Sequence, residues 1–460
     1  MSNDLHRRLE ATCPGRVIGP RHHAYDAVRQ LFNGMYDTRP AVICLPRDAA
    51  EVGAVVRHAR DAGIATTVRG AGHNIGGAAS VADGLVLDLR LIKNVTIDPA
   101  ARLARVGGGA TWATFDDAAA TYGLATTGGT FDTTGVGGLT LGGGIGHLMG
   151  RYGLACDNVE SYTLITADGE QLVVDAEREP ELNWALRGAG HHFGVVTDFT
   201  FRMHSVPTVY GGFVAYPGDR ADEALRLFRD LMSTAPDELT CTLLLERHGP
   251  AQDKAAVMSV AYCGDDAGYR AELDRVLRSV APIDWQIRDR TYLSMQMALG
   301  RLPYGLQHYW SARCVDAMPE ELVDGLVERF AATRVTDPCN NTILIEPIHG
   351  AVRHGEGAVP FRDARFNITG MAIWTPPANA GEQVGWARSV AARAEPHSRW
   401  GDGYVNYVTE GIGEDGSVRA VRTFGVDAYR RLADLKRKVD PDGFFTSTYT
   451  ISPDLSDAAR

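Results

Sequence analysis

The stretch TVRGAGHNIGG, residues 67–77, sets one arginine and one histidine among four glycines, directly after an apolar run. Glycine lets a backbone approach a ligand closely, and the bare N–H groups of such loops bind anions. A histidine between glycines is poorly placed to pack in a core. His73 is therefore a candidate to contact a phosphate, or to form a covalent bond through an imidazole nitrogen.

Standard nucleotide motifs do not account for this loop. The chain holds no G-x-x-x-x-G-K-[ST] sequence, and Ile75 stands where G-x-G-x-x-G would need its third glycine. The complete spacing at 411–416 falls in an acidic loop with no strand before it. Further glycine-rich segments lie at 105–109, 128–146 and 188–194. Composition leaves two interpretations open: a set of tight turns, or separate loops that wrap one extended anion.

The elements that would position these loops change in character near residue 207. Before it, the pattern predicts strands or hairpins at 41–46, 64–70, 85–90, 95–109, 159–175 and 195–206, and helices at 48–63 and 111–123. After it, the pattern predicts strands at 240–246, 256–263, 341–347 and 367–374, and helices at 222–233, 268–280, 319–331, 381–394 and 427–438. This order favours an α+β fold whose second part is a sheet with helices on one face. A chain of 460 residues also exceeds one ordinary core, which indicates two domains.

Charge and composition exclude several classes of partner. The net charge is −11 and the basic residues form no long cluster, which speaks against nucleic acid and anionic membranes. No apolar run reaches the ~20 residues of a membrane helix, and the first residues lack the apolar stretch of a signal peptide. A cytoplasmic location is therefore expected. Seven scattered cysteines without a C-x-x-C pair indicate neither a disulfide framework nor a structural zinc site.

Several motifs together identify a family. Residues 69–73, RGAGH, resemble the R-[GS]-[GA]-G-H diphosphate loop of the FAD-linked oxidases of the vanillyl-alcohol oxidase superfamily, in the berberine-bridge-enzyme-like branch. Matching segments follow in the family's order: 83–90, RVGGGATW at 105–112, the glycine-rich run 135–159, LRGAGHHFGVVT at 186–197, YVNY at 404–407 and RLADLKRKVDPDGFF at 431–445. Leu139 and the overall spacing are similar to the bacterial, 6-hydroxy-D-nicotine-oxidase-like members.

The resemblance implies the two-domain α+β fold of that family. This fold joins an FAD-binding PCMH-type domain to a substrate domain whose antiparallel sheet is covered by helices. Residues 1–206 would form the FAD-binding domain, 207–403 the substrate-binding domain, and 404–460 a tail that returns to the FAD-binding domain. The expected assembly is a monomer or a homodimer.

The resemblance also implies which residues bind FAD. Matched motif by motif, they are Arg69, Gly70, Ala71, Gly72, His73, Asn74, Gly129, Thr130, Gly135, Gly138, Gly142, Asp157, Asn158, Val195, Val196 and Asn406. His73 stands where the family attaches FAD covalently through the flavin 8α-methyl group. A second link, from a cysteine to flavin C6, is not expected because Phe131 occupies the place of that cysteine. Cys156 stands where other members have Ala or Ser.

The neighbouring histidines His191 and His192 raise the question of a metal. Adjacent residues on a strand or turn point apart, and no cluster of carboxylates or cysteines accompanies them. No metal site is expected.

The candidates for catalysis come from the end of the chain and from one strand of the substrate sheet. Tyr407 and Tyr404 would act as base or as phenols that orient the substrate, Asn406 would lie close to the flavin, and Glu346 would be an acid or base. On a regular strand Tyr404 and Asn406 would share a face and Tyr407 would point away, so both tyrosines could not reach one atom. Each tyrosine could instead be a core aromatic, and Glu346 a surface or a salt-bridged residue. Trp374 is expected to line the pocket.

The implied function is that of a flavin-dependent oxidase. It would remove hydride from a C–OH or C–NH carbon of a small or medium organic molecule, with natural-product tailoring as one setting. Molecular oxygen would reoxidise the covalently bound FAD and give hydrogen peroxide. Two alternatives stay open: an amine oxidase of the hydroxynicotine type, and a non-catalytic, flavin-bearing protein that sequesters a ligand.

Overall fold

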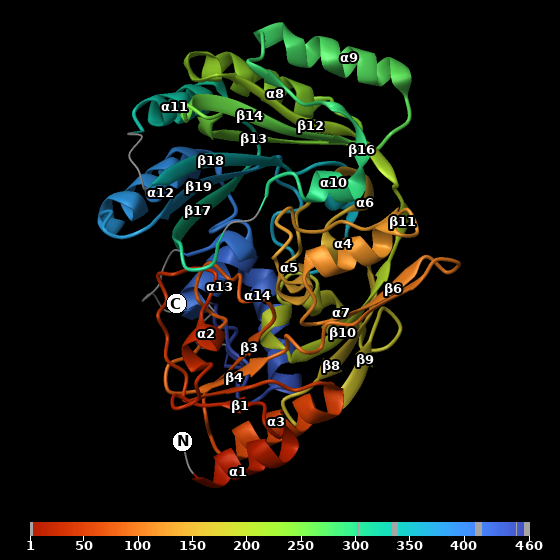
Figure 1. Cartoon of the computed structure of the whole chain (residues 1–460), viewed down its shortest axis with the longest axis vertical. Coiled ribbons are helices and arrows are strands. Elements are labelled where there is room, and N and C mark those ends of the chain that lie inside the picture. Colours follow the sequence, from red (N-terminus) through yellow and green to blue (C-terminus); the bar gives the residue numbers. More distant parts are fainter. Residues whose placement is uncertain (1–2, 301–302, 334–338, 410–415, 448, 455–460) are drawn as a thin grey trace.

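The computed structural model describes residues 3–300, 303–333, 339–409, 416–447 and 449–454. Figure 1 shows two parts stacked along the long axis, with the N-terminal elements (red to yellow) in one part and the middle of the chain in the other. The last two helices, α13 (Gly416–Phe424) and α14 (Val426–Val439), return to the N-terminal part. Tyr429 of α14 belongs to the same buried cluster as Trp112 and Phe199. The first part is thus built from both ends of the chain.

The first sheet of the N-terminal part carries the glycine-rich loop at its edge. Its strands, in the order β1-β2-β4-β3, are β1 (Val17–Ile18), β2 (Val42–Cys44), β4 (Leu85–Asp88) and β3 (Thr66–Arg69). β4 pairs in parallel with β2 and with β3, so Arg69 and Asp88 are register partners. The helices α1 (Asn3–Thr12) and α3 (Ala49–Asp61) pack beside it. α3 begins at the predicted N-cap, where the Asp48 side chain accepts the N–H of Glu51.

The second sheet of this part is antiparallel. Its strands, in the order β5-β6-β10-β8-β9, are β5 (Val95–Asp98), β6 (Leu103–Gly107), β10 (Val195–Arg202), β8 (Val159–Ile165) and β9 (Gln171–Val174). The two predicted hairpins are the pairs β5–β6 and β8–β9. The helices α4 (Trp112–Ala120) and α7 (Pro180–Leu186) contribute to the same core as this sheet.

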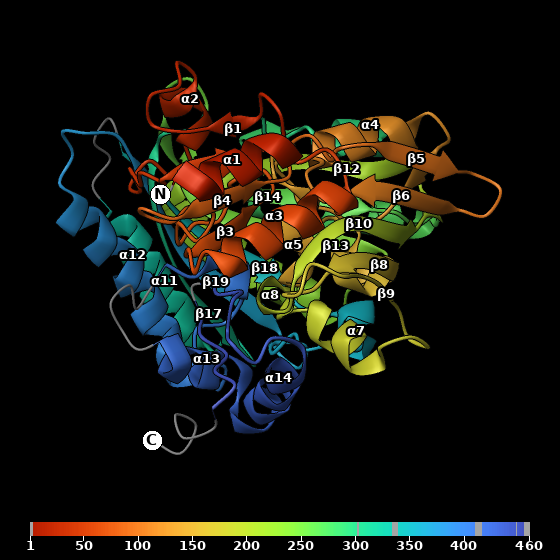
Figure 2. The same cartoon turned by 90° about the horizontal axis from the view of Figure 1, so that it is seen from below.

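The middle of the chain forms one antiparallel sheet of eight strands. They are β12 (Thr208–Pro217), β13 (Leu239–His248), β14 (Asp253–Tyr262), β15 (Asp284–Trp285), β16 (Arg288–Thr291), β17 (Gln307–Val315), β18 (Asn340–Pro347) and β19 (Phe366–Trp374). The helices that cover its outer face are α8 (Ala221–Ser233), α9 (Ala267–Leu277), α11 (Glu320–Ala331) and α12 (Ala380–Ala394). Figures 1 and 2 both show α11 and α12 side by side. The predicted α+β fold, with helices on one face of the second sheet, is confirmed. The sequence patterns missed β12, β15 and β16, and of β17 they placed only Tyr309 and Trp310 on a strand.

Short elements connect these parts. The helices are α2 (Tyr25–Arg29), α5 (Val136–Leu141), α6 (Met149–Tyr152) and α10 (Tyr292–Gln296), and the short strands are β7 (Leu124–Ala125) and β11 (His204–Ser205). The 3₁₀ turns are η1 (Ala155–Asn158), η2 (Gly190–His192), η3 (Gly218–Arg220), η4 (Arg278–Val280), η5 (Gly350–His354), η6 (Glu395–His397) and η7 (Val405–Tyr407).

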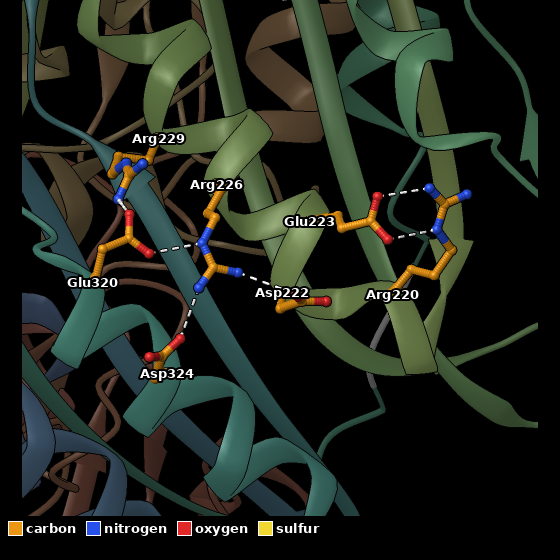
Figure 3. A network of polar contacts seen from close by, with 7 residues as sticks. All are labelled: Arg220, Asp222, Glu223, Arg226, Arg229, Glu320 and Asp324. Carbon is orange, nitrogen blue, oxygen red and sulfur yellow. Dashed lines mark hydrogen bonds and ion pairs between the residues drawn. The ribbon is translucent and has the colours of Figure 1, made fainter.

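An ion-pair network joins two of the outer helices, as Figure 3 shows. Arg226 of α8 lies 2.7 Å from both Glu320 and Asp324 of α11. Arg229 lies 2.6 Å from Glu320. Solvent screens ion pairs at exposed carboxylates, so these pairs contribute little to stability. The network joins α8 to α11 on the side of the sheet that faces away from the N-terminal part.

Strand register decides which side chains face the N-terminal part. Trp310 of β17 lies opposite Met371 of β19, which lies opposite Thr342 of β18. Because side chains alternate along a strand, the even positions of β17 and β18 and the odd positions of β19 share this inner face. Glu346 and Asn367 are also register partners on it. The inner face thus carries the carboxyl group of Glu346 beside the amide of Asn367.

Candidate active site

A cavity opens between the N-terminal part and the inner face of the eight-stranded sheet. Its empty space, counted together with the mouth that opens to solvent, is about 1480 Å³. On one side, which we call the glycine-rich wall, it is lined by Gly70, Gly72, Gly108, Gly129, Gly135, Gly137, Gly138 and Gly194. The other side, the tyrosine-bearing wall, consists of Trp310, Tyr404, Asn406 and Tyr407.

The loop that follows β3 forms the centre of the glycine-rich wall. Gly72 has a φ of 73°, in the region that favours glycine. Gly135 packs so closely on the loop that a Cβ atom there would lie 2.9 Å from the Ala71 nitrogen. Asn74 Oδ1 accepts the N–H of Ala78 at 3.0 Å and closes the loop. The predicted cofactor residues that line the cavity are Gly70, Ala71, Gly72, His73, Asn74, Gly129, Thr130, Gly135, Gly138, Val196 and Asn406.

Four other predicted cofactor residues support this wall from behind and do not line the cavity. Asp157 pairs with Arg362 at 2.6 Å, and Val195 is buried in a core cluster. Asn158 Nδ2 donates to two backbone carbonyls, each at 2.9 Å. A Cβ atom on Gly142 would lie 2.2 Å from Asn406 Oδ1, so glycine here makes room for that side chain.

Arg69 also departs from its predicted role. Its Nε donates to Asp88 Oδ2 at 2.8 Å, and its Nη2 lies 2.6 Å from the same oxygen. Both side chains are at most 1% exposed, and Arg69 does not line the cavity. The guanidinium is therefore committed to the neighbouring strand, because a buried charge without a partner costs several kcal/mol. Contacts to an anion in the cavity are left to the backbone N–H groups of the loop.

His73 lines the cavity with an unpaired nitrogen. Its Nε2 is buried and has no hydrogen-bond partner. Burial, with a smaller contribution from His308, lowers the pKa of His73 to about 3. The imidazole is thus neutral at physiological pH and keeps a free lone pair, which a covalent bond to a cofactor requires.

Two positions bear on a second covalent link. Phe131, which the resemblance set at the place of the second cysteine, lines the cavity. Cys156 is fully buried in an apolar cluster, and burial raises the pKa of its thiol.

The two neighbouring histidines lie in different surroundings. His191 lines the cavity and its Nε2 lies 3.0 Å from the carbonyl oxygen of Gly138, whereas His192 is 1% exposed. In the described ranges, no three His, Cys, Asp or Glu side chains gather closely enough to hold a metal ion.

Residues 405–407 form a 3₁₀ turn that Tyr404 precedes, so the segment is not the regular strand that the prediction assumed. The Tyr407 N–H donates to the Tyr404 carbonyl at 3.0 Å, and this i, i+3 turn brings the two side chains to the same side. Their rings meet edge to face with centroids 4.7 Å apart. Both tyrosines therefore reach the same cavity.

A chain of hydrogen bonds runs from Tyr407 into the sheet. The Tyr407 hydroxyl donates to Glu346 Oε1 at 3.0 Å, and Asn367 Nδ2 donates to Glu346 Oε2 at 2.9 Å. Burial raises the pKa of Glu346 to about 7, although both hydrogen bonds oppose the rise. Glu346 is 5% exposed, so the alternative of a surface residue is wrong. A carboxyl group that titrates near neutrality behind a phenol can accept a proton through it.

Trp310, and not the predicted Trp374, is the tryptophan that lines the cavity. Trp310 lines the cavity, and its ring lies 4.9 Å from that of Tyr407, edge to face. Trp374 is fully buried in the core between the sheet and its outer helices, so its predicted place in the pocket is wrong. The reason is strand alternation: even positions of β19 point away from the cavity.

The end of the chain supplies a further edge of the cavity that the residue predictions left out. Phe445, Thr446 and Ser447 line it. Lys436 Nζ anchors this segment by donating to the carbonyls of His192 and Phe445 and to Asp440 Oδ2, at 2.6–2.7 Å. Lys436 and Asp440 lie four residues apart within the segment 431–445, which the resemblance had matched to the family.

The residues present fit FAD. The cavity is lined by residues of the loop after β3, of the 404–407 turn and of the 445–447 segment. The glycine-rich wall exposes backbone N–H groups suited to a diphosphate. A Cβ atom on Gly138 would meet no protein atom within 4 Å. The unpaired Nε2 of His73 is suited to bond the methyl carbon attached to a flavin ring.

Within the part of the chain that is described, no helix is both long and apolar enough to cross a membrane.

Family models match both ends of the chain. Residues 40–175 match the model of an FAD binding domain, and residues 403–452 match the model described as berberine and berberine like. These segments contain the glycine-rich loop and the 404–407 turn respectively.

Known proteins resemble the chain over nearly its whole length. (R)-6-hydroxynicotine oxidase of Paenarthrobacter nicotinovorans is 30% identical over 96% of this chain and 97% of its own. The crystal structure of 6-hydroxy-D-nicotine oxidase from Arthrobacter nicotinovorans superposes with a TM-score of 0.86, at 27% identity, over 96% of this chain and 98% of its own. A chitooligosaccharide oxidase, with a TM-score of 0.86 at 19% identity over 98% and 99% of the two chains, shares the fold.

Proposed function

Because this chain belongs to the FAD-linked oxidoreductases of the vanillyl-alcohol oxidase superfamily, in the berberine-bridge-enzyme-like branch, we propose that it is an oxidase of a small or medium organic molecule. It would oxidise a C–OH or C–NH carbon and pass the electrons to molecular oxygen. The observation that carries the proposal is the Tyr407–Glu346 hydrogen bond of 3.0 Å at the wall of the cavity.

FAD would be attached through a single covalent bond to His73. In net terms, one C–H bond of the flavin 8α-methyl group and the N–H bond of the imidazole are replaced by one C–N bond. The two electrons and two protons released pass to O₂ and give one H₂O₂. The neutral, unpaired Nε2 of His73 supports this attachment. Phe131, at the place of the second cysteine, supports a single link.

When bound, FAD supplies the acceptor for hydride and the reaction with oxygen. The chain's own residues handle the proton. The Tyr407 phenol would take the proton of a substrate hydroxyl while its own proton moves to Glu346 Oε1, 3.0 Å away. Asn367 keeps the carboxylate oriented by its bond to Oε2. Ionised Glu346 is therefore the form that accepts, which is the dominant form above a pH of about 7.

Tyr404 would orient the substrate site rather than act as the base. Its oxygen accepts the N–H groups of Gly144 at 3.2 Å and Ile145 at 3.3 Å, and Asn406 Nδ2 at 2.8 Å. A phenol oxygen has two lone pairs, so its capacity to accept is already used. Asn406 Nδ2 also donates to the Leu139 carbonyl at 3.0 Å, which ties the turn to the glycine-rich wall.

A second candidate function is the oxidation of an amine. It is favoured by the 30% identity to (R)-6-hydroxynicotine oxidase. A neutral amine needs no base, so Tyr407 would only shape the site. Flavin-dependent sequestration without turnover is the third reading, and it leaves the Tyr407–Glu346 pair without a role.

One experiment separates these functions. The purified flavoprotein is supplied with panels of alcohols and amines in air, and H₂O₂ is measured. H₂O₂ from an alcohol supports the proposal, H₂O₂ only from amines supports the second function, and none from either panel would leave sequestration. Acid precipitation tests the link: yellow colour in the pellet is expected, and colour released into the supernatant would contradict attachment at His73.

A further inference from the structure

The ring of His73 is held by two aromatic side chains that lie outside the glycine-rich loop. It stacks on Phe32 with ring centroids 4.1 Å apart and planes at 16°, and it meets Tyr304 edge-on at 5.4 Å and 90°. Its Nε2 makes no hydrogen bond. Flat stacking and an edge contact fix the plane of the ring without occupying a nitrogen.

Phe32 is itself fixed on both sides. Its N–H donates to the Gly72 carbonyl at 3.1 Å, one residue before His73. Its ring also faces His308 of β17, with centroids 4.5 Å apart, so Phe32 lies in contact with two imidazoles. Phe32 is 3% exposed. A smaller side chain here would leave a space beside the His73 ring, and the ring could then turn.

Asn33 joins the His73 loop to the eight-stranded sheet. Its Nδ2 donates to the Ile75 carbonyl at 2.8 Å and to the His308 carbonyl at 2.9 Å. Its Oδ1 accepts the N–H groups of His308 at 2.9 Å and Met35 at 3.0 Å. The side chain is fully buried, and all four of its hydrogen bonds are made. Replacement of Asn33 by an apolar residue would leave several of these buried backbone groups without a hydrogen-bond partner.

The two segments meet through their backbones as well. Gly34 N–H donates to the Leu306 carbonyl at 2.7 Å, and Gly305 N–H donates to the Phe32 carbonyl at 3.1 Å. A Cβ atom on Gly34 would lie 2.1 Å from the Gly305 oxygen, so only glycine allows this approach. The Tyr304 hydroxyl donates to the Ala71 carbonyl at 2.7 Å and completes the contact with the loop.

We propose that Phe32, Asn33 and Tyr304 are positioning residues that make His73 competent to bond its cofactor. The inference rests on the proposed attachment at His73 and adds what the motif itself lacks. The residues that surround His73 come from two segments. Residues 32–34 belong to the N-terminal part, and residues 304–308 lead into and begin β17 of the eight-stranded sheet. The ring of His73 is therefore ordered only once the sheet has docked, and attachment follows docking.

The test measures how fast apoprotein becomes covalently flavinylated. Protein produced without flavin is mixed with FAD, and samples are acid-precipitated over time. Misplacement of a reacting group by about 1 Å costs about 100-fold in rate, so Phe32→Leu and Tyr304→Ala are expected to slow attachment by about 10- to 100-fold. Phe32→Tyr and Tyr304→Phe keep the rings and are expected to react at close to the wild-type rate.

A matched control separates this effect from simple destabilisation. Phe228→Leu removes a similar amount of buried ring from the core beneath the outer helices, far from the loop. It is expected to lower the melting temperature and leave the attachment rate unchanged. Equal slowing in Phe228→Leu and Phe32→Leu would overturn the inference, as would wild-type attachment in Phe32→Leu. If the wild type attaches no flavin, the proposed link at His73 falls as well, and the two failures are thereby distinguished.

Discussion

The two walls of the cavity present different chemical groups. The glycine-rich wall presents backbone from loops of the N-terminal part, and His73 stands within it. The tyrosine-bearing wall offers side chains held by a 3₁₀ turn against a regular sheet. Backbone N–H groups do not change when side chains are substituted, so they suit a ligand that is always the same. Side chains, in contrast, can be substituted to fit a different ligand. The difference suggests that the cofactor is set by the first wall and the substrate by the second.

The largest expected effect comes from the tyrosine-bearing wall. Tyr407→Phe removes the phenol that donates to Glu346, and kcat/KM for an alcohol substrate should fall by about 10²–10⁴-fold. The covalent flavin content should stay unchanged. Tyr309→Phe, on the outer face of β17, is the control and should keep wild-type kinetics. Unchanged turnover in Tyr407→Phe would assign the proton transfer elsewhere.

Replacement of Lys436, behind the glycine-rich wall, should change the free energy of unfolding rather than the reaction. Lys436→Met leaves the Asp440 carboxylate buried without its partner, which costs about 3–5 kcal/mol of unfolding free energy. Chemical denaturation measures the loss. Lys438→Met on the exposed side of α14 should change the free energy by less than about 0.5 kcal/mol. Similar values for both variants would mean that the buried pair does not hold the 445–447 segment.

The pH dependence of an alcohol oxidation should report Glu346. Its folded pKa is raised to about 7, and the ionised carboxylate is the proton acceptor. The value of kcat/KM should therefore fall about tenfold per pH unit below that pKa and level off above it. In Glu346→Gln the low-pH limb should disappear together with most of the activity. A limb that persists in this variant would belong to another group.

The smallest effect should come from filling the empty side of the glycine-rich wall. A Cβ atom on Gly138 meets no protein atom, so Gly138→Val should fold normally and intrude only on a bound ligand. In a His73→Ala background, where binding is reversible, FAD affinity should drop by about 10- to 100-fold. Gly385→Val, exposed on α12, is the control and should bind FAD normally. Equal affinities would place the flavin away from Gly138.

The sequence predicted the glycine-rich wall well because its signal is local. Gly70 to Asn74 are consecutive, and a short motif carries the whole loop. Arg69 was misjudged because the motif does not show that Asp88 stands beside it in register. The pattern found the outer helices and many of the strands, since burial imposes a period on each, but β12, β15 and β16 went unrecognised.

The tyrosine-bearing wall could be predicted in composition but not in geometry. Whether YVNY forms a strand or a 3₁₀ turn depends on contacts with residues 139–145, more than 250 positions away. The frame around His73 had no sequence signal at all, because Asn33 and His308 lie 275 residues apart. Only the folded chain brings them together.

The most direct test of the account is an anaerobic half-reaction that follows the flavin absorbance. An alcohol that yields H₂O₂ in air is mixed rapidly, without oxygen, with wild-type protein and with Tyr407→Phe. We expect the wild-type flavin to bleach rapidly and the flavin of the variant to bleach about 10²–10⁴-fold more slowly. The absorbance should return when oxygen is admitted. Equal bleaching rates in the two proteins, or a reduced flavin that oxygen does not restore, would contradict the account.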